Sequence, residues 1–207
     1  MNHTTLFEPI SNTIKSLELK QISEDRKATL KPLIDYLNDK IKAKKPIRLN
    51  FICTHNSRRS HLSQVWAQTM AAYYNIQNVN CYSGGTEATA MFPKVGETLN
   101  KQGFKIIKLS EEENPVYSIK FSKNEPSIIA FSKQFSDEFN PASEFAAIMT
   151  CSSADSGCPF VLGSDKRIPI TYEDPKVSDG TPQQTETYLN RSLQIATEMK
   201  FVFSSLE

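Results

Sequence analysis

The pattern of hydrophobic and polar residues switches repeatedly between the period of a strand and the period of a helix. Short apolar runs predict strands at IRLNFIC, VNCYS, IIKL, SIIAFS and FAAIMTC. The segments between them carry apolar residues at helical spacing, and Thr185 to Ser204 predicts a long final helix. Strands that alternate with helices favour an α/β fold, with a parallel sheet covered by helices on both faces.

Residues 1–45 follow a different pattern from the rest of the chain. In SEDRKATLKPLIDYLNDKIKAKK, Ser23 is a candidate N-cap, acidic residues occupy the first turn and lysines the last. Pro32 is expected to kink or restart this helix. We therefore expect an N-terminal helical extension over residues 1–45, packed against a main domain over residues 46–207.

The stretch CTHNSRRS joins the first predicted strand to the helix that follows. A loop at this point directs several backbone N–H groups into one cup, and the helix dipole adds partial positive charge there. Cys53 at the mouth is a candidate nucleophile, the planar fork of Arg59 suits a tetrahedral oxyanion, and Ser60 can donate a hydrogen bond to the sulfur. A buried structural cysteine beside a surface arginine would give the same C-x5-R letters. The strand before and the helix after favour the functional interpretation.

The composition of the chain indicates an ordinary globular protein and does not point to a particular function. The chain has 207 residues, 39% of them hydrophobic, and a net charge of +1, which is typical of a globular protein and favours neither nucleic acid nor a membrane as partner. The start MNHTTLFEPISNT lacks the pattern of a signal peptide, and a cytoplasmic location is expected. In that setting the four cysteines are expected to be catalytic, metal-binding or buried thiols, not structural disulfides.

At this point CTHNSRRS resembles the phosphate-binding loop of the low-molecular-weight protein tyrosine phosphatase family, and the resemblance runs from Ile47 to the C-terminus. YSGGT resembles its supporting serine–glycine turn, and YEDP resembles its general-acid loop. The resemblance implies a four-stranded parallel sheet, with Cys53 as nucleophile and Asp174 as general acid. It also implies an oxyanion-binding loop made of Thr54, His55, Asn56, Ser57, Arg58 and Arg59.

The segment TCSSADSGCP resembles the redox segment of the thioredoxin-coupled arsenate reductases of the same family. That resemblance implies a relay in which Cys53 attacks arsenate, Cys151 attacks Cys53, and Cys158 attacks Cys151. The resulting Cys151–Cys158 disulfide would be reduced by thioredoxin, and a phosphatase side activity would be compatible. If the segment is helical, the two cysteines lie about 10 Å apart along the axis, so they can pair only after the helix unwinds.

Several alternatives stay open from the residues alone. Cys151 and Cys158 can also be read as zinc ligands or as two unrelated core thiols, and Asp174 as a turn residue before Pro175. A phosphatase acting on phosphate monoesters and a non-enzymatic redox sensor or oxyanion-binding module are the competing functions. We expect no cofactor, no metal site and a monomeric protein.

The sequence departs from the family pattern at four positions. His55 replaces a usual glycine, so it either crowds the loop or faces solvent, and Asn56 is expected to take the tight turn. Arg58 replaces a small residue, and either adds charge at the rim or is solvated. Gln64 stands where related reductases can carry a glutamate that helps to bind potassium, so no potassium site is expected. Lys176 follows YEDP where many phosphatases have tyrosine, which weakens the phosphotyrosine interpretation, and His61 is expected on the exposed side of its helix.

Overall fold

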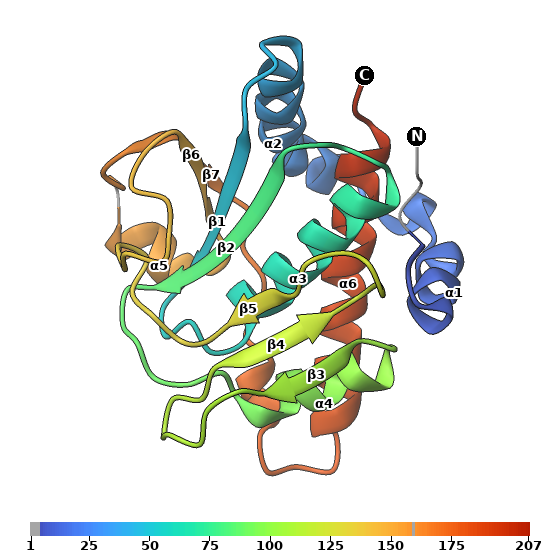
Figure 1. Cartoon of the computed structure of the whole chain (residues 1–207), viewed down its shortest axis with the longest axis vertical. Coiled ribbons are helices and arrows are strands. Elements are labelled where there is room, and N and C mark those ends of the chain that lie inside the picture. Colours follow the sequence, from blue (N-terminus) through green and yellow to red (C-terminus); the bar gives the residue numbers. More distant parts are fainter. Residues whose placement is uncertain (1–4, 159) are drawn as a thin grey trace.

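A computed structural model describes residues 5–158 and 160–207 of the chain (Figure 1). The helices and strands follow one another in this order: α1 (Glu8–Ser16), η1 (Leu19–Gln21), α2 (Glu24–Lys42), β1 (Ile47–Cys53), α3 (Arg59–Tyr73), β2 (Val79–Gly85), α4 (Pro93–Lys101), β3 (Lys105–Lys108), β4 (Tyr117–Lys120), β5 (Ile128–Ala130), β6 (Phe145–Met149), α5 (Ser152–Gly157), β7 (Ser164–Pro169), η2 (Pro175–Ser178) and α6 (Gln184–Ser204). No helix among these residues is long and apolar enough to cross a membrane.

The main sheet has four parallel strands in the order β2-β1-β6-β7, as the sequence predicts. In the register of this sheet, Cys53 at the end of β1 lies beside Gly85 at the end of β2. Strand β6 ends at Met149, two residues before Cys151. Because all four strands are parallel, their carboxyl ends meet at one edge, and both cysteines lie there.

Alternate side chains of the central strands point to opposite faces of this sheet, and each face has its own hydrophobic core. Leu49 and Phe51 of β1 face the larger core, which helices α2, α3 and α6 cover, whereas Ile52 belongs to a smaller cluster next to α5. Figure 1 shows α5 on one side of the sheet and α3 and α6 on the other. Helices therefore cover both faces, as the alternation of the sequence predicts.

Two of the predicted strands join a second sheet. β3, β4 and β5 form a three-stranded antiparallel sheet, so the segments IIKL and SIIAFS do not extend the parallel sheet. Strand β7, with the sequence SDKRIP, supplies the fourth parallel strand instead. Its charged residues give it no apolar run, and the sequence pattern therefore missed it.

The N-terminal extension is helical, and it shares the larger core with the rest of the chain. Ser23 caps α2 by accepting a hydrogen bond from the Arg26 N–H at 3.3 Å. Helix α2 continues unbroken through Pro32, so the helix does not restart there. Five fully buried side chains of this core come from the extension: Ile10, Ile14, Leu30, Leu33 and Leu37. Residues 5–45 thus belong to the same hydrophobic unit as the sheet.

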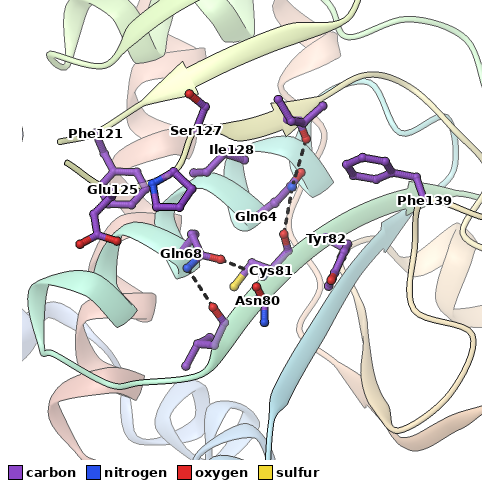
Figure 2. Close-up of a pocket in the computed structure, with 13 residues that line it drawn as sticks. Gln64, Gln68, Asn80, Cys81, Tyr82, Phe121, Glu125, Ser127, Ile128 and Phe139 are labelled. Atoms are coloured by element: carbon purple, nitrogen blue, oxygen red, sulfur yellow. Dashed lines mark hydrogen bonds between the residues drawn. The ribbon is translucent and has the colours of Figure 1, made fainter. Parts of the chain in front are cut away.

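The free edge of β2 is covered by amide side chains in place of a fifth strand. Figure 2 shows Gln64 and Gln68 reaching from α3 toward this edge. Gln68 donates to the Val79 carbonyl at 3.1 Å and accepts from the Cys81 N–H at 2.9 Å, and Gln64 donates to the Cys81 carbonyl at 3.0 Å. These bonds satisfy backbone groups that would otherwise offer a pairing edge to another chain.

Candidate active site

The predicted oxyanion loop folds between β1 and the first turn of α3. Cys53 is 3% exposed, and its Sγ lies 3.1 Å from Ser60 Oγ. Asn56 has a φ of 44° and donates from Nδ2 to the same Ser60 Oγ at 2.9 Å. The positive φ agrees with the expectation that Asn56 takes the tight turn, and its side chain fixes the Ser60 hydroxyl beside the sulfur.

Gly85 allows β2 to lie directly against this loop. A Cβ at Gly85 would be 2.6 Å from the Asn56 nitrogen and 2.7 Å from the Thr54 carbonyl oxygen. Thr86 donates from Oγ1 to that same Thr54 carbonyl at 3.1 Å. The turn YSGGT therefore supports the loop through a backbone approach that any side chain at Gly85 would block.

Arg59 reaches from the start of α3 to the segment around Asp174. Its Nη1 donates to the Tyr172 carbonyl at 3.0 Å, and its Nη2 pairs with Asp174 Oδ2 at 2.5 Å. Among the described residues, none accepts a hydrogen bond from the buried Arg59 Nε. An anionic oxygen is the partner that such a buried donor suits.

A small hollow lies between the loop and Asp174. It is lined by Cys53, His55, Ser57, Arg58, Arg59 and Asp174. A thiol, the Arg59 guanidinium and the Asp174 carboxyl group thus meet around one space. That combination can hold an oxyanion, attack it with sulfur and protonate a departing oxygen.

Arg58 is locked in place, unlike a solvated rim residue. Its Nε donates to the Tyr188 hydroxyl at 2.6 Å, its Nη2 pairs with Asp179 Oδ2 at 2.6 Å, and its Cζ lies 4.1 Å from the ring centroid of Phe92. Burial works to raise the pKa of Asp179, but hydrogen bonds from Tyr188 and Gln184 and the Arg58 charge outweigh it and lower that pKa. Asp179 and Tyr188 belong to no sequence motif, and the pattern gave no signal for them.

Of the remaining residues of the loop and the first turn of α3, His55 is exposed, whereas Ser57 and His61 are buried. The His55 side chain is 44% exposed, so it faces solvent and does not crowd the loop. Ser57 is buried, and its carbonyl accepts a hydrogen bond from the Phe92 N–H at 3.0 Å. His61 is fully buried, and its Nδ1 lies 3.3 Å from Ser83 Oγ. The expectation of an exposed His61 was wrong, because this face of α3 packs against β2, where Ser83 lies, and near Lys133.

The other two cysteines of the predicted relay flank helix α5. Cys151 is the N-cap, is 1% exposed, and accepts a hydrogen bond at Sγ from the Ala154 N–H at 3.3 Å. Cys158 is the C-cap and is partly exposed. Both are free thiols, and the intervening segment is helical. The two cysteines can therefore pair only if α5 unwinds.

All three relay cysteines belong to one side of the molecule. Cys53 and Cys151 are members of the smaller hydrophobic cluster, and Cys158 packs against it. Cys151 Sγ also lies 3.4 Å from the hydroxyl of Thr54, the residue next to Cys53. Cys81 lies in the other core, where burial raises its pKa, so it is separate from the group.

Arg167 from β7 holds the far end of α5. Its guanidinium donates to the Cys158 carbonyl at 2.9 Å and to the Asp155 carbonyl, and it pairs with Asp155 Oδ1 at 2.5 Å. These contacts restrain the carbonyl groups at the helix C-terminus. Arg167 was not predicted, because it lies on β7, the strand that the apolar pattern missed.

The Gln64 position differs from a typical cation site. Gln64 lies in a pocket between α3, β2 and β5, and its Nε2 is used by the β2 edge (Figure 2). Among the described residues, no group of three His, Cys, Asp or Glu side chains is arranged to hold a metal ion.

Comparisons with known proteins agree with this geometry. No protein-family model matches the chain. An arsenate reductase of Staphylococcus aureus (strain Newman) is 26% identical over 148 residues, which cover 72% of this chain and 91% of that protein. An arsenate reductase of Bacillus licheniformis is 23% identical over 141 residues, or 68% of this chain and 83% of that protein.

Two solved structures share the fold. An arsenate reductase in the phosphate-binding state has a TM-score of 0.50 and 17% identity, over 78% of this chain and 99% of that one. A low-molecular-weight protein tyrosine phosphatase from T. tengcongensis has a TM-score of 0.50 and 18% identity, over 77% of this chain and 99% of that one. The chain therefore has the low-molecular-weight protein tyrosine phosphatase fold and is similar in sequence to bacterial arsenate reductases.

Proposed function

We propose that the chain reduces arsenate to arsenite with electrons from its own thiols, and that thioredoxin in the cytoplasm returns those electrons. The observation that carries the proposal is the gathering of Cys53, Cys151 and Cys158 beside one oxyanion hollow. The relatives named arsenate reductase support the same reaction.

The first step joins sulfur to arsenic. Arg59 and the loop N–H groups hold arsenate, and the Cys53 thiolate attacks the arsenic atom. One As–OH bond breaks, and Asp174 donates the proton with which that oxygen leaves as water. In the free protein Asp174 Oδ2 pairs with Arg59 Nη2 at 2.5 Å, so arsenate has to take this place on the guanidinium, and Asp174 has to bind from solvent the proton that it donates.

The second step transfers the electrons. The Cys151 thiolate attacks Cys53 Sγ, a Cys53–Cys151 disulfide forms, and the S–As bond breaks with its electron pair on arsenic. Arsenic gains two electrons and leaves as arsenite, while the two cysteines together lose two. Cys158 then attacks Cys151, which frees the Cys53 thiolate and leaves a Cys151–Cys158 disulfide for a thioredoxin dithiol to reduce.

Phosphate-monoester hydrolysis is the alternative function. The residues that line the hollow include Cys53, Arg59 and Asp174, and none of them belongs to α5. Attack by Cys53, protonation of the leaving oxygen and later hydrolysis of a phosphocysteine would require neither Cys151 nor Cys158. This reaction would use the same hollow and leave the redox segment idle.

Single cysteine variants separate the two functions. We expect Cys53→Ser to abolish arsenate reduction and nitrophenyl phosphate hydrolysis. We expect Cys151→Ser and Cys158→Ser to abolish multiple-turnover arsenate reduction, measured as NADPH oxidation with thioredoxin and thioredoxin reductase, and to leave ester hydrolysis intact. Cys81→Ser is the matched control, because that thiol lies in the other core and should leave both activities unchanged.

The outcomes decide between the candidates. If Cys151→Ser and Cys158→Ser reduce arsenate as fast as the unaltered protein, the relay is wrong. Nitrophenyl phosphate hydrolysis without arsenate reduction in the unaltered protein would favour the phosphatase. Binding of an oxyanion without arsenate reduction and without nitrophenyl phosphate hydrolysis would favour a sensor or binding module.

A further inference from the structure

Tyr172 connects the oxyanion arginine to the redox segment through its backbone. Its carbonyl accepts from Arg59 Nη1 at 3.0 Å, and its N–H donates to the Thr150 carbonyl at 3.1 Å, one residue before Cys151. Asp174 follows two residues later. A shift of Tyr172 would therefore move the Arg59 guanidinium and the acid loop together.

The side chain of Tyr172 is held by the N-terminal extension. The Arg26 guanidinium, from the first turn of α2, lies 4.9 Å from the centroid of the Tyr172 ring. That guanidinium is itself fixed by two hydrogen bonds to Glu198 of α6, from Nε at 2.9 Å and from Nη2 at 2.7 Å. The Glu198 side chain is 4% exposed, so the pair is shielded from solvent. A planar guanidinium stacks on an aromatic face and binds a carboxylate in two places at once, which an ammonium does not.

We infer that Arg26 is a positioning residue for the oxyanion site, and that the N-terminal extension completes the active site by holding Tyr172 under Arg59. The inference rests on the proposed function in one respect: both require that the hollow beside Cys53 and Arg59 binds an oxyanion. Arg26 touches neither the thiol nor the space for the anion, and its effect passes through the ring of Tyr172 to the carbonyl that orients Arg59.

A second ion pair on the same helix provides a matched control. Lys40 of α2 pairs with Asp165 at 2.7 Å, and its Nζ lies 5.4 Å from the Tyr36 ring centroid. This pair also joins the extension to the main sheet and also involves an aromatic ring. The Lys40–Asp165 pair lies at the start of β7, because Asp165 is the second residue of that strand. This pair contacts neither Tyr172 nor Arg59.

The test measures phosphate binding by isothermal titration calorimetry in three variants. R26Q/E198Q removes both charges of the pair, so no lone buried charge remains. We expect its Kd for inorganic phosphate to rise about tenfold or more, since small misplacements of a binding group are costly. The Kd of K40Q/D165N for phosphate should stay within about twofold of the value for the unaltered protein. This comparison requires that the two double variants have similar thermal midpoints of unfolding.

Arg26→Lys separates positioning from stability. It keeps the charge opposite Glu198, so the chain should remain folded, but it loses the planar stack on Tyr172. We expect weakened phosphate binding in this variant with little loss of thermal stability. In arsenate reduction, KM should rise more than kcat falls, because the altered group holds the substrate and does not react with it.

The inference is overturned if Arg26→Lys and R26Q/E198Q bind phosphate as tightly as the unaltered protein, or if K40Q/D165N weakens binding equally. It is also overturned if the unaltered protein binds no phosphate. Phosphate binding that depends on Arg26, in a protein that does not reduce arsenate, would refute the proposed reduction and leave the inference standing.

Discussion

Neighbouring residues of the oxyanion loop have separate tasks because they point in different directions. Arg58 is the N-cap of α3 and has non-helical backbone angles, whereas Arg59 is the first residue of the helix. Arg59 therefore points to Asp174 and the Tyr172 carbonyl, whereas Arg58 points to Asp179 and Tyr188. The two guanidinium groups together fasten the loop to the whole segment from Tyr172 to Asp179.

Ser60 is expected to support the Cys53 sulfur during the reaction. We predict that Ser60→Ala lowers turnover about tenfold or more, because a hydrogen bond to a charged group contributes about 1.5–3 kcal/mol. Ser63→Ala is the control, since Ser63 is also buried in α3 and, among the described residues, its hydroxyl has no hydrogen-bond partner. Steady-state assays of both variants test this, and equal losses would contradict a role for Ser60 at the sulfur.

His61 is expected to make stability depend on pH. Burial, together with the nearby Lys133 charge, lowers the pKa of His61 to about 3 from 6.5. Between these values the unfolded chain binds a proton that the folded chain does not, so stability is full above about pH 6.5 and falls as the pH falls toward about 3.

Urea unfolding at pH 7 and pH 5 measures this dependence. We expect His61→Gln to lose less stability between the two pH values than the unaltered protein loses. His55→Gln, at the exposed histidine of the loop, should behave like the unaltered protein. A His61→Gln variant with the same pH dependence would contradict the prediction.

At the scale of elements, α5 separates the two cysteines that pair in the proposed relay. The helix is six residues long, and its ends are the caps Cys151 and Cys158. Arg167 stabilises its C-terminal carbonyls, while its composition, SSADSG, gives weak intrinsic helix propensity. The element is therefore ordered in the reduced protein and inexpensive to unwind.

Gly157→Ala should slow the pairing of Cys151 and Cys158. Among the described residues, nothing lies within 4 Å of the position that a Cβ would take at Gly157, so the methyl group fits. Alanine stabilises a helix by about 1 kcal/mol over glycine, which would reduce the rate of a step that requires unwinding about fivefold.

Rapid quenching with a thiol reagent and mass spectrometry would measure that rate. Gly96→Ala in α4 is the control, because the added carbon makes ordinary contacts there with Met91 and Ile106, and no residue of α4 belongs to the cluster that contains Cys53 and Cys151. Disulfide formation at an unchanged rate in Gly157→Ala would show that α5 does not have to unwind.

At the scale of the whole molecule, the extension and the sheet share one core. Residues of α1 and α2 bury their apolar side chains together with those of β1, α3 and α6. Lys200 of α6 adds hydrogen bonds from Nζ to the carbonyls of Ile14 and Leu17, both at 2.8 Å. We propose that residues 1–45 are part of one folding unit with residues 46–207.

Deletion of residues 1–45 should prevent stable folding. It would expose the apolar faces that the extension covers and leave the buried Glu198 without Arg26. We expect the full chain to unfold in one urea transition, followed by the fluorescence of the buried Trp66, and the shortened chain to show none. A shortened chain with a cooperative transition and native phosphate binding would refute this.

Local chemistry explains which features could be predicted from the sequence. Ser23 caps its helix, α6 forms over the range that its periodicity predicts, and Asn56 takes the positive φ, because each depends on residues close in the chain. The C-x5-R loop belongs to the same class, since a strand, a cysteine and a helix start are consecutive. These features were predictable because neighbouring residues determine them.

Features that depend on contacts between distant segments of the chain could be seen only in the tertiary structure. β7 is a strand because β6 offers it an edge, His61 is buried because it packs against Ser83 of β2, and Tyr172 lies between Arg26 and Arg59. Arg26 and Arg59 are far apart in the chain, and neither carries a local mark of the connection. The sequence by itself indicated the candidate reacting groups and determined the loop that carries Cys53 and Arg59. The packing of distant segments determined how those groups are aimed, because direction depends on contacts that no local pattern encodes.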